Sequence, residues 1–343
     1  MNRWILSLVL GVVVSAAALW LAFRNVPFGD LVAYIGTIEI FWLFPSMAAI
    51  LAGFFCRVVR WQLILGSSIR VGYWSAHHPL MIGFMMNCIL PGRVGEVARP
   101  LILKKRNQVP FTTGLATVAA ERVFDLLILI GMVAAVMAAV KIDPQFSRTF
   151  AGYELSGETL VGVARAMVQL SVLLVAGVLF VSVKKTRSLA LGLAGFLPGK
   201  LSDILTRIIE NIAAGFSLVK DPGRMAACLG LSVGTWAFTA VSYYVMAMGS
   251  PGVGLSFLEL TAVMVIVCFF IALPSVPGFW GLWEAGGVFA MALFGVPAKE
   301  AAGFTLVNHA VQMFPVILVG LISAIVTSVN VLQVSKESRV QSG

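Results

Sequence analysis

Charged residues are scarce in this sequence. Asp, Glu, Lys and Arg make up only 11% of its 343 residues, whereas 59% are hydrophobic and the mean hydropathy is +0.97. Soluble domains carry about 25% charged residues. The deficit excludes a soluble enzyme, a disordered chain and a nucleic-acid-binding domain, so the composition indicates an integral membrane protein.

Several chemical signatures are missing as well. The sequence has no Walker phosphate-binding loop, no HExxH and no DDxxD-like acidic cluster, which excludes direct nucleotide hydrolysis and argues against a lipid-modifying metalloenzyme. Only three His are present, and the four Cys lie in apolar stretches without CxxC spacing. We therefore expect no disulfide, no metal site and no cofactor, and small buried side chains at Cys56, Cys88, Cys228 and Cys268.

Long apolar stretches take the place of the missing charge. A helix needs about 20 apolar residues to cross the hydrocarbon core of a bilayer. The sequence therefore predicts an all-α polytopic membrane protein, a single transmembrane domain over residues 1–343 with about six full spans. These spans are expected at 4–23, 40–56, 118–140, 161–183, 225–248 and 301–332.

Lys and Arg are unevenly placed between these spans. Basic residues mark the cytoplasmic side of a membrane protein, and an N-terminus inside the cell puts most of them on that side. The pattern predicts cytoplasmic N and C termini, and it accounts for the net charge of +9 without nucleic acid as a partner. Anionic lipid headgroups are natural partners of such a surface. The basic clusters are Arg57/Arg60/Arg70, 104–106, 184–187, 200–224 and 336–339.

Residues 189–223 alternate apolar and polar side chains with helical spacing. This pattern predicts an amphipathic helix that lies on the cytoplasmic membrane surface.

Two apolar regions do not fit simple spans. Residues 71–103 lie between basic clusters of the same side, are too short for two crossings and are broken by Pro91-Gly92. Residues 255–294 are broken in the same way by prolines and glycines, among them Pro277 and Gly278. We expect two re-entrant helical hairpins, the first open to the cytoplasm and the second to the outside.

The order span, hairpin, span then occurs twice, at about 40–140 and about 225–332, in opposite orientations. Inverted repeats with broken helices in matching positions point to a transporter with its site near the membrane midplane. The sequence therefore predicts two repeat halves around a central polar cavity. The hairpin-tip residues expected to shape this cavity with their backbone are Pro91, Gly92, Gly95, Pro277, Gly278 and Gly281.

Ionisable residues within the apolar segments are candidate site residues. Each charge would cost about 3 kcal/mol if it faced lipid at mid-bilayer, so these side chains must pair with one another or line a wet cavity. Guanidinium groups suit phosphate because they bind it bidentately, which favours Arg93, Arg99 and Arg122 as headgroup ligands. A structural ion-pair network is the alternative. The residues expected to line the cavity or to couple protons are Glu96, Glu121, Asp125, Glu284 and His309.

Two motifs resemble a known family. LPGRVGEVARPLILKKR (90–106) followed by ATVAAERVFDLLIL (116–129), and LPSVPGFWGLWEAGGVFAMALFGVPAKEAAG (273–303), are similar to the signatures of the lysylphosphatidylglycerol synthase transmembrane-region family. Its members include the flippase domain of multiple peptide resistance factors and many stand-alone membrane proteins. The resemblance covers nearly the whole chain and implies two re-entrant hairpins around a cavity and movement of a lipid between leaflets.

The motifs also carry the family's functional positions onto this chain, and two departures are visible. Relatives often have an Arg near Asn308 and His309, where this chain has none. The chain ends soon after Gln333, so we expect it to lack the aminoacyltransferase domain of the bifunctional members.

The combined prediction is a lipid translocase of the bacterial inner membrane. It would move a phospholipid or a polyprenyl-linked lipid, with membrane lipids as partners and without enzymatic activity of its own. A second copy of the chain in a homo-oligomer and a partner enzyme of lipid synthesis are the candidate protein partners. The alternatives are an intramembrane lipid-modifying enzyme and a non-catalytic partner subunit of a lipid-synthesis pathway.

Overall fold

A computed structural model describes residues 3–66, 69–91, 93–139, 147–150, 153–156, 183–199, 221–273 and 276–342, with scattered residues between 162 and 181 and between 201 and 210. The described chain is helical except for one small antiparallel hairpin, β1 (Ser147–Phe150) and β2 (Tyr153–Ser156). The helices in chain order are α1 (Arg3–Phe23), α2 (Phe28–Ile35), η1 (Ile40–Trp42), α3 (Leu43–Leu65), α4 (Tyr73–Ile89), α5 (Gly95–Asn107), α6 (Phe111–Ala139), α8 (Lys184–Ala194), α10 (Pro222–Met248), α11 (Phe257–Phe270), η2 (Pro277–Phe279), α12 (Leu282–Leu293), α13 (Ala298–Val326) and α14 (Val331–Ser342).

Three described helices are long and apolar enough to cross a membrane: Ile40–Leu65, Pro222–Met248 and Ala298–Val326. A fourth crossing results if Val9–Phe23 and Phe28–Ile35, which are bent by 79°, form one broken span. The three helices match the predicted spans at 40–56, 225–248 and 301–332, and the bent pair, if it is one span, matches the prediction at 4–23. The chain is therefore a multi-pass helical membrane protein.

Of the two remaining predicted spans, the structure describes one and leaves most of the other outside the described residues. The span at 118–140 corresponds to α6, whose 29 residues reach about 44 Å and carry three charged side chains in the middle of an apolar sequence. The span at 161–183 lies almost entirely outside the described residues. The same holds for most of the predicted amphipathic helix at 189–223, of which α8 contains the first residues.

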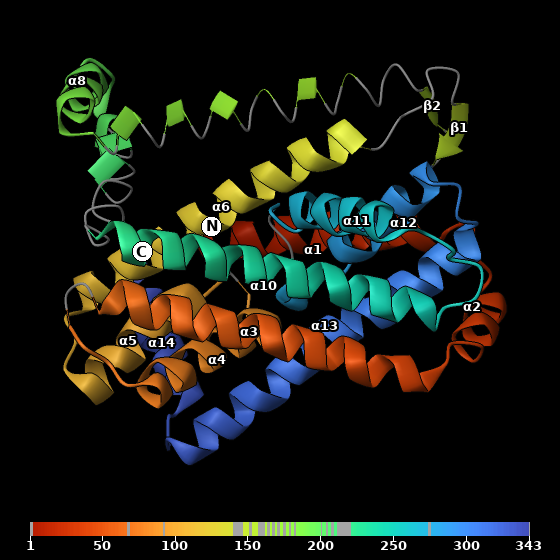
Figure 1. Cartoon of the computed structure of the whole chain (residues 1–343), viewed down its shortest axis with the longest axis horizontal. Coiled ribbons are helices and arrows are strands. Elements are labelled where there is room, and N and C mark those ends of the chain that lie inside the picture. Colours follow the sequence, from red (N-terminus) through yellow and green to blue (C-terminus); the bar gives the residue numbers. More distant parts are fainter. Residues whose placement is uncertain are drawn as a thin grey trace.

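Helices α3 and α10 pack side by side and run in opposite directions (Figure 1). Small residues at the contact let the two backbones approach closely, as is usual between membrane helices. From one end of the pair to the other, the contacts that set the register are Ser46 with Ser242, Gly53 with Thr235, and Arg60 with Ser232.

Each predicted hairpin is a pair of short packed helices, α4 with α5 and α11 with α12. The four helices have 12 to 17 residues, so the longest reaches about 26 Å and none can cross a hydrocarbon core of about 30 Å alone. In the first hairpin α4 and α5 touch backbone to backbone at Gly83 and Gly95, where any side chain on Gly95 would collide with the Gly83 carbonyl. This contact explains why the first motif needs glycine at position 95.

The tips of the two hairpins are built from backbone that leaves the helical region. Arg93 has a φ of 52° at the first tip, and Gly278 and Gly281 have φ of 71° and 90° at the second. A left-handed residue lets the chain reverse within a few positions, and glycine adopts it without steric cost. Gly281 is further constrained because a Cβ there would collide with the Ser15 carbonyl of α1.

The elements that carry the basic clusters gather at one end of the molecule. In Figure 1, α5, α8 and α14 lie toward the left, whereas α2 and the β1–β2 hairpin lie toward the right. The order long helix, helical hairpin, long helix also occurs twice, as α3, α4–α5, α6 and as α10, α11–α12, α13. That the two sets are inverted repeats stays a prediction.

Candidate functional site

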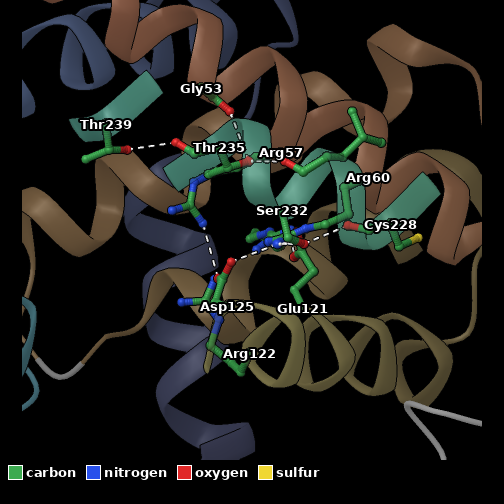
Figure 2. A network of polar contacts seen from close by, with 12 residues as sticks. Gly53, Arg57, Arg60, Glu121, Arg122, Asp125, Cys228, Ser232, Thr235 and Thr239 are labelled. Atoms are coloured by element: carbon green, nitrogen blue, oxygen red, sulfur yellow. Dashed lines mark hydrogen bonds and ion pairs between the residues drawn. The ribbon is translucent and has the colours of Figure 1, made fainter. Parts of the chain in front are cut away.

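A cluster of buried charges joins α3, α5 and α6. Glu121 and Asp125 are four positions apart on α6 and therefore share one face of that helix. Arg60 of α3 contacts both carboxylates, with Nη1 2.8 Å from Asp125 Oδ1 and Nη2 3.5 Å from Glu121 Oε1. Its side chain is fully buried, so Arg60 is the centre of what we call the arginine cluster (Figure 2).

Three further guanidinium groups complete the arginine cluster. Arg57 Nη1 lies 3.2 Å from Asp125 Oδ2, and Arg122 Nη2 lies 3.1 Å from the same oxygen. Arg99 of α5 binds the other carboxylate, with Nη2 2.5 Å from Glu121 Oε2. The ion pairs thus connect the first hairpin to the long helices α3 and α6.

Neutral groups hold the arginines in place. Ser232 of α10 accepts a hydrogen bond from Arg60 Nη1 at 2.7 Å and donates its own proton to the Cys228 carbonyl at 2.7 Å. The ring of Trp61 lies 4.3 Å from the Arg99 guanidinium, and its Nε1 donates to Thr117 Oγ1 at 2.9 Å. Figure 2 shows how α10 closes the cluster on the side of Ser232.

The arginine cluster carries more positive than negative charge. Four guanidinium groups share the two carboxylates of Glu121 and Asp125. Counting Glu96, which lies in the first turn of α5 but forms none of these ion pairs, still leaves a positive excess. The Nε groups of Arg60, Arg99 and Arg122 are buried without a hydrogen-bond partner. Arg122 is the accessible member, since 40% of its side chain is exposed. The cluster is therefore suited to bind an anion at Arg122.

Arg57 and Arg60 were predicted to follow the span at 40–56 as part of a cytoplasmic basic cluster, and the structure places both within the same helix instead. Helix α3 continues through both residues to Leu65, and their side chains turn inward to the two acids of α6. Their spacing of three positions within a helical stretch was the available signal, because it puts both on one helix face. Because they were counted only as charges that mark the cytoplasmic side, two of the four arginines of the cluster were not predicted as site residues.

A second buried pair lies at the tip of the second hairpin. His309 Nδ1 of α13 is 2.6 Å from Glu284 Oε1 of α12, and His309 Nε2 is 2.8 Å from the Gly278 carbonyl oxygen. The other carboxylate oxygen of Glu284 accepts the backbone N–H of Gly281 at 2.7 Å. Both side chains are at most 1% exposed. The pair therefore fastens both glycines of the tip to α13.

The two hairpin tips touch each other. Arg93 Nη2 donates to the Ile271 carbonyl oxygen at 2.9 Å, and its guanidinium lies 5.8 Å from the centre of the Phe279 ring. Arg93 is exposed and belongs to neither buried group. Pro91 lies half-buried beside it, and Gly92 lies outside the described residues.

The structure thus sorts the predicted site residues into separate places. Arg99, Arg122, Glu121 and Asp125 meet in the arginine cluster, whereas Glu284 and His309 form their own pair. Within the described chain, no hydrogen bond or ion pair joins the two groups. Nor do the described residues contain a group of three His, Cys, Asp or Glu side chains that could hold a metal ion. Sequence reasoning missed Arg57, Arg60, Trp61 and Ser232 as members of the site.

The helices and the arginine cluster together define a class: a polytopic helical membrane protein with a buried, positively charged site where the first helical hairpin meets the long helices α3 and α6. More particularly, the chain belongs to the family described as lysylphosphatidylglycerol synthase TM region, which matches residues 8–320. The resemblance predicted from the two motifs is confirmed.

Two relatives are archaeal proteins. Glycosyltransferase AglD of Haloferax volcanii is 24% identical over 97% of this chain, but the match covers only 56% of that protein, so the chain spans little more than half of its relative. A UPF0104 membrane protein of Methanothermobacter thermautotrophicus is 24% identical over 78% of each chain. No solved structure matches the chain.

Proposed function

We propose that this protein is a lipid translocase that moves lipids with an anionic headgroup between the two leaflets. The observation that carries the proposal is the positive excess of the arginine cluster, four guanidinium groups against two carboxylates, with Arg122 half open to a ligand. Uncompensated buried charge is costly. A phosphate group that binds at Arg122 compensates it with bidentate, charge-assisted hydrogen bonds.

The surroundings of the cluster favour a lipid over a soluble anion. Helices α3 and α10, which contribute Arg57, Arg60 and Ser232 to the cluster, and the neighbouring helix α13 carry large apolar side chains that are exposed, as expected against acyl chains. The headgroup would reach the arginines while the tails stay in the bilayer. These exposed apolar side chains include Phe44, Leu51, Phe55, Val233, Leu318 and Ile325.

The proposal includes a membrane arrangement. We place about six spans in the inner membrane with cytoplasmic termini, and α4–α5 and α11–α12 as two re-entrant hairpins of an inverted repeat. Helices too short to cross and tips that touch each other support this arrangement. The central polar cavity would then lie between the tips and the arginine cluster.

The test is lipid exchange in proteoliposomes. Fluorescent lipids with anionic or zwitterionic headgroups are followed by their accessibility to a membrane-impermeant quencher. Wild type is compared with Arg122→Gln and with Arg224→Gln, whose side chains are 40% and 42% exposed. We expect Arg122→Gln to slow exchange of the anionic lipid at least about tenfold, equivalent to about 1.4 kcal/mol, and Arg224→Gln to leave it unchanged. Equal exchange in all three proteins contradicts the proposal.

A second candidate is a lipid-modifying enzyme, because one relative carries the name of a glycosyltransferase. The same purified protein, mixed with labelled lipid and nucleotide-activated sugars, distinguishes the two. A translocase leaves the lipid chemically unchanged, whereas a transferase yields a new lipid species that mass spectrometry identifies.

A further inference from the structure

Both ring nitrogens of His309 face hydrogen-bond acceptors. Nδ1 faces a carboxylate oxygen of Glu284 and Nε2 faces the backbone carbonyl oxygen of Gly278. A neutral imidazole carries one N–H and can satisfy only one of these acceptors. The geometry therefore requires one proton more than a neutral His309 and an ionised Glu284 possess.

Two arrangements place this proton. Either His309 is an imidazolium that donates to both acceptors, or Glu284 is a carboxylic acid whose O–H donates to Nδ1 while Nε2–H donates to Gly278. Both contain the same number of protons and have the same total charge. In both, the second oxygen of Glu284 still accepts the Gly281 N–H. In either arrangement the pair as a unit holds one proton more than a neutral His309 and an ionised Glu284.

The aromatic surroundings favour the imidazolium. The Trp283 ring is stacked on the imidazole with centroids 4.5 Å apart and planes 2° from parallel, and the Trp280 ring lies at 4.5 Å on a tilt of 48°. Indole faces attract cations, most strongly where water is excluded. The two indole rings beside the buried imidazole therefore stabilise a positive charge on it.

Other titratable groups stand further off. Within the described chain, no hydrogen bond or ion pair joins any of them to Glu284 or His309. Loss of the proton therefore leaves a buried negative charge with no cation in contact, and an unpaired Gly278 carbonyl or Glu284 oxygen. Besides Arg93 at the first tip, the described titratable or charged side chains on α13 itself and on the helices packed against α12 and α13 are Asp30, Tyr34, Cys56, Arg57, Arg60, Tyr73, His77, His78, Cys88, Arg224, Cys228, Tyr243, Tyr244, Glu259, Cys268, Lys299 and Glu300.

We propose that Glu284 and His309 form a proton-binding site whose single proton fastens the tip of the second hairpin to α13. With the proton bound, His309 holds Gly278 and Glu284 holds Gly281. Without it, the tip is released from α13 and its contact with Arg93 of the first hairpin is free to change. Coupling of this proton to lipid movement rests on the proposed function, whereas the proton site itself does not.

The substitution Glu284→Gln separates the proton from the hydrogen bonds. A glutamine amide N–H donates to Nδ1 of a neutral His309, its carbonyl oxygen accepts the Gly281 N–H, and Nε2–H still donates to Gly278. Every contact of the tip is kept, and none of them needs the additional proton. The variant therefore mimics the protonated pair at every pH, and His309→Gln serves as the variant that releases Gly278.

The first experiment locates the proton without any need for transport. ¹⁵N-histidine NMR on the full chain, with His77→Gln and His78→Gln to leave one histidine, is combined with infrared spectra of the Glu284 carboxyl. At about pH 7 we expect an imidazolium in wild type and a neutral Nε2–H imidazole in Glu284→Gln. A protonated carboxyl beside a neutral imidazole also supports the site. A neutral imidazole beside an ionised carboxylate overturns it.

The second experiment follows the tip. Hydrogen–deuterium exchange of residues 276–284, corrected for intrinsic rates, is measured from about pH 6 to about pH 10. We expect exchange to rise with pH in wild type, to stay low in Glu284→Gln and to be high throughout in His309→Gln. The same pH response in wild type and Glu284→Gln overturns the proposal. If both experiments succeed but the protein moves no lipid, the proposed function fails and the proton site stands.

Discussion

Arg60 and Asp125 lie 65 positions apart in the chain, yet Arg60 Nη1 donates to Asp125 Oδ1 at 2.8 Å inside the helical body. The same carboxylate also binds Arg57 and Arg122. One carboxylate therefore pairs with three guanidinium groups. Loss of this acid removes three ion pairs, whereas loss of one of the arginines leaves the acid with two.

Because Asp125 has three partners, we expect its substitution to lower the free energy of unfolding more than substitution of one of its arginines. Asp125→Asn leaves three arginines without their main partner, so we expect it to lower the free energy of unfolding by about 3–5 kcal/mol. Arg57→Gln leaves Asp125 with two partners and removes surplus positive charge, so we expect a loss of at most about 1 kcal/mol. Denaturant unfolding in detergent measures both. Equal losses contradict the positive excess on which the proposed function depends.

The contact between Gly83 and Gly95 predicts a steric effect. Gly95→Ala drives a methyl group into the Gly83 carbonyl and forces α4 and α5 apart, so we expect a loss of about 1–3 kcal/mol or more. Gly131→Ala on α6 meets no atom within 4 Å and gains helix propensity. We expect it to leave the midpoint of thermal unfolding unchanged or slightly raised. A Gly95→Ala protein as stable as Gly131→Ala excludes the close approach of the two helices.

The backbone conformation of Arg93 at the first tip predicts that glycine is more stable than alanine at this position. Its φ of 52° is one that glycine adopts freely and alanine does not. Arg93→Gly and Arg93→Ala both lose the hydrogen bond to Ile271, but only the glycine relieves the backbone. We expect Arg93→Gly to be more stable than Arg93→Ala by about 1 kcal/mol, measured as the shift between their unfolding midpoints. The reverse order contradicts the left-handed tip.

A surface contact predicts a response to acid. Lys105 Nζ lies 2.7 Å from the carboxylate of Glu337 on α14, outside the candidate spans, and its hydrogen bond lowers the pKa of Glu337. A lowered pKa means that the contact is complete above the ordinary pKa of glutamate and is lost as the pH falls through the lowered value. We expect deuterium exchange of 331–342, corrected for intrinsic rates, to rise on acidification in wild type. Glu337→Gln has this raised exchange already at about pH 7, and an unchanged helix in both contradicts the contact.

Much of the helical architecture could be predicted from the sequence, for physical reasons. The length of the apolar stretches alone located the spans at 40–56, 225–248 and 301–332. A chain that crosses the bilayer must form all its backbone hydrogen bonds internally, so a long apolar stretch folds as a helix. The breaks near Pro91 and Pro277 identified both helical hairpins. Helix α2, the β1–β2 hairpin and the bend of 79° before α2 were missed, since short elements leave no long periodic signal.

The site was predicted as a set of residue types but not as a set of contacts. Glu121 and Asp125 were identified because charge in an apolar helix must find a partner. Their partners Arg57 and Arg60 were placed beyond the end of the span at 40–56, because an apolar stretch alone does not show how far its helix continues into a charged segment. Glu284 and His309 were both named, yet only the fold brings positions 25 apart into one hydrogen bond.

The distance between α3 and α6 along the chain has a consequence for synthesis. Helix α3 enters the membrane with two arginines, each costing about 3 kcal/mol at the centre of a bilayer. Their acidic partner is 65 residues further on, which a ribosome adds in about 3–13 s at 5–20 residues per second. For that interval α3 is an incomplete span. The insertion machinery must retain it, or leave its arginines at the membrane surface, until α6 arrives to neutralise them.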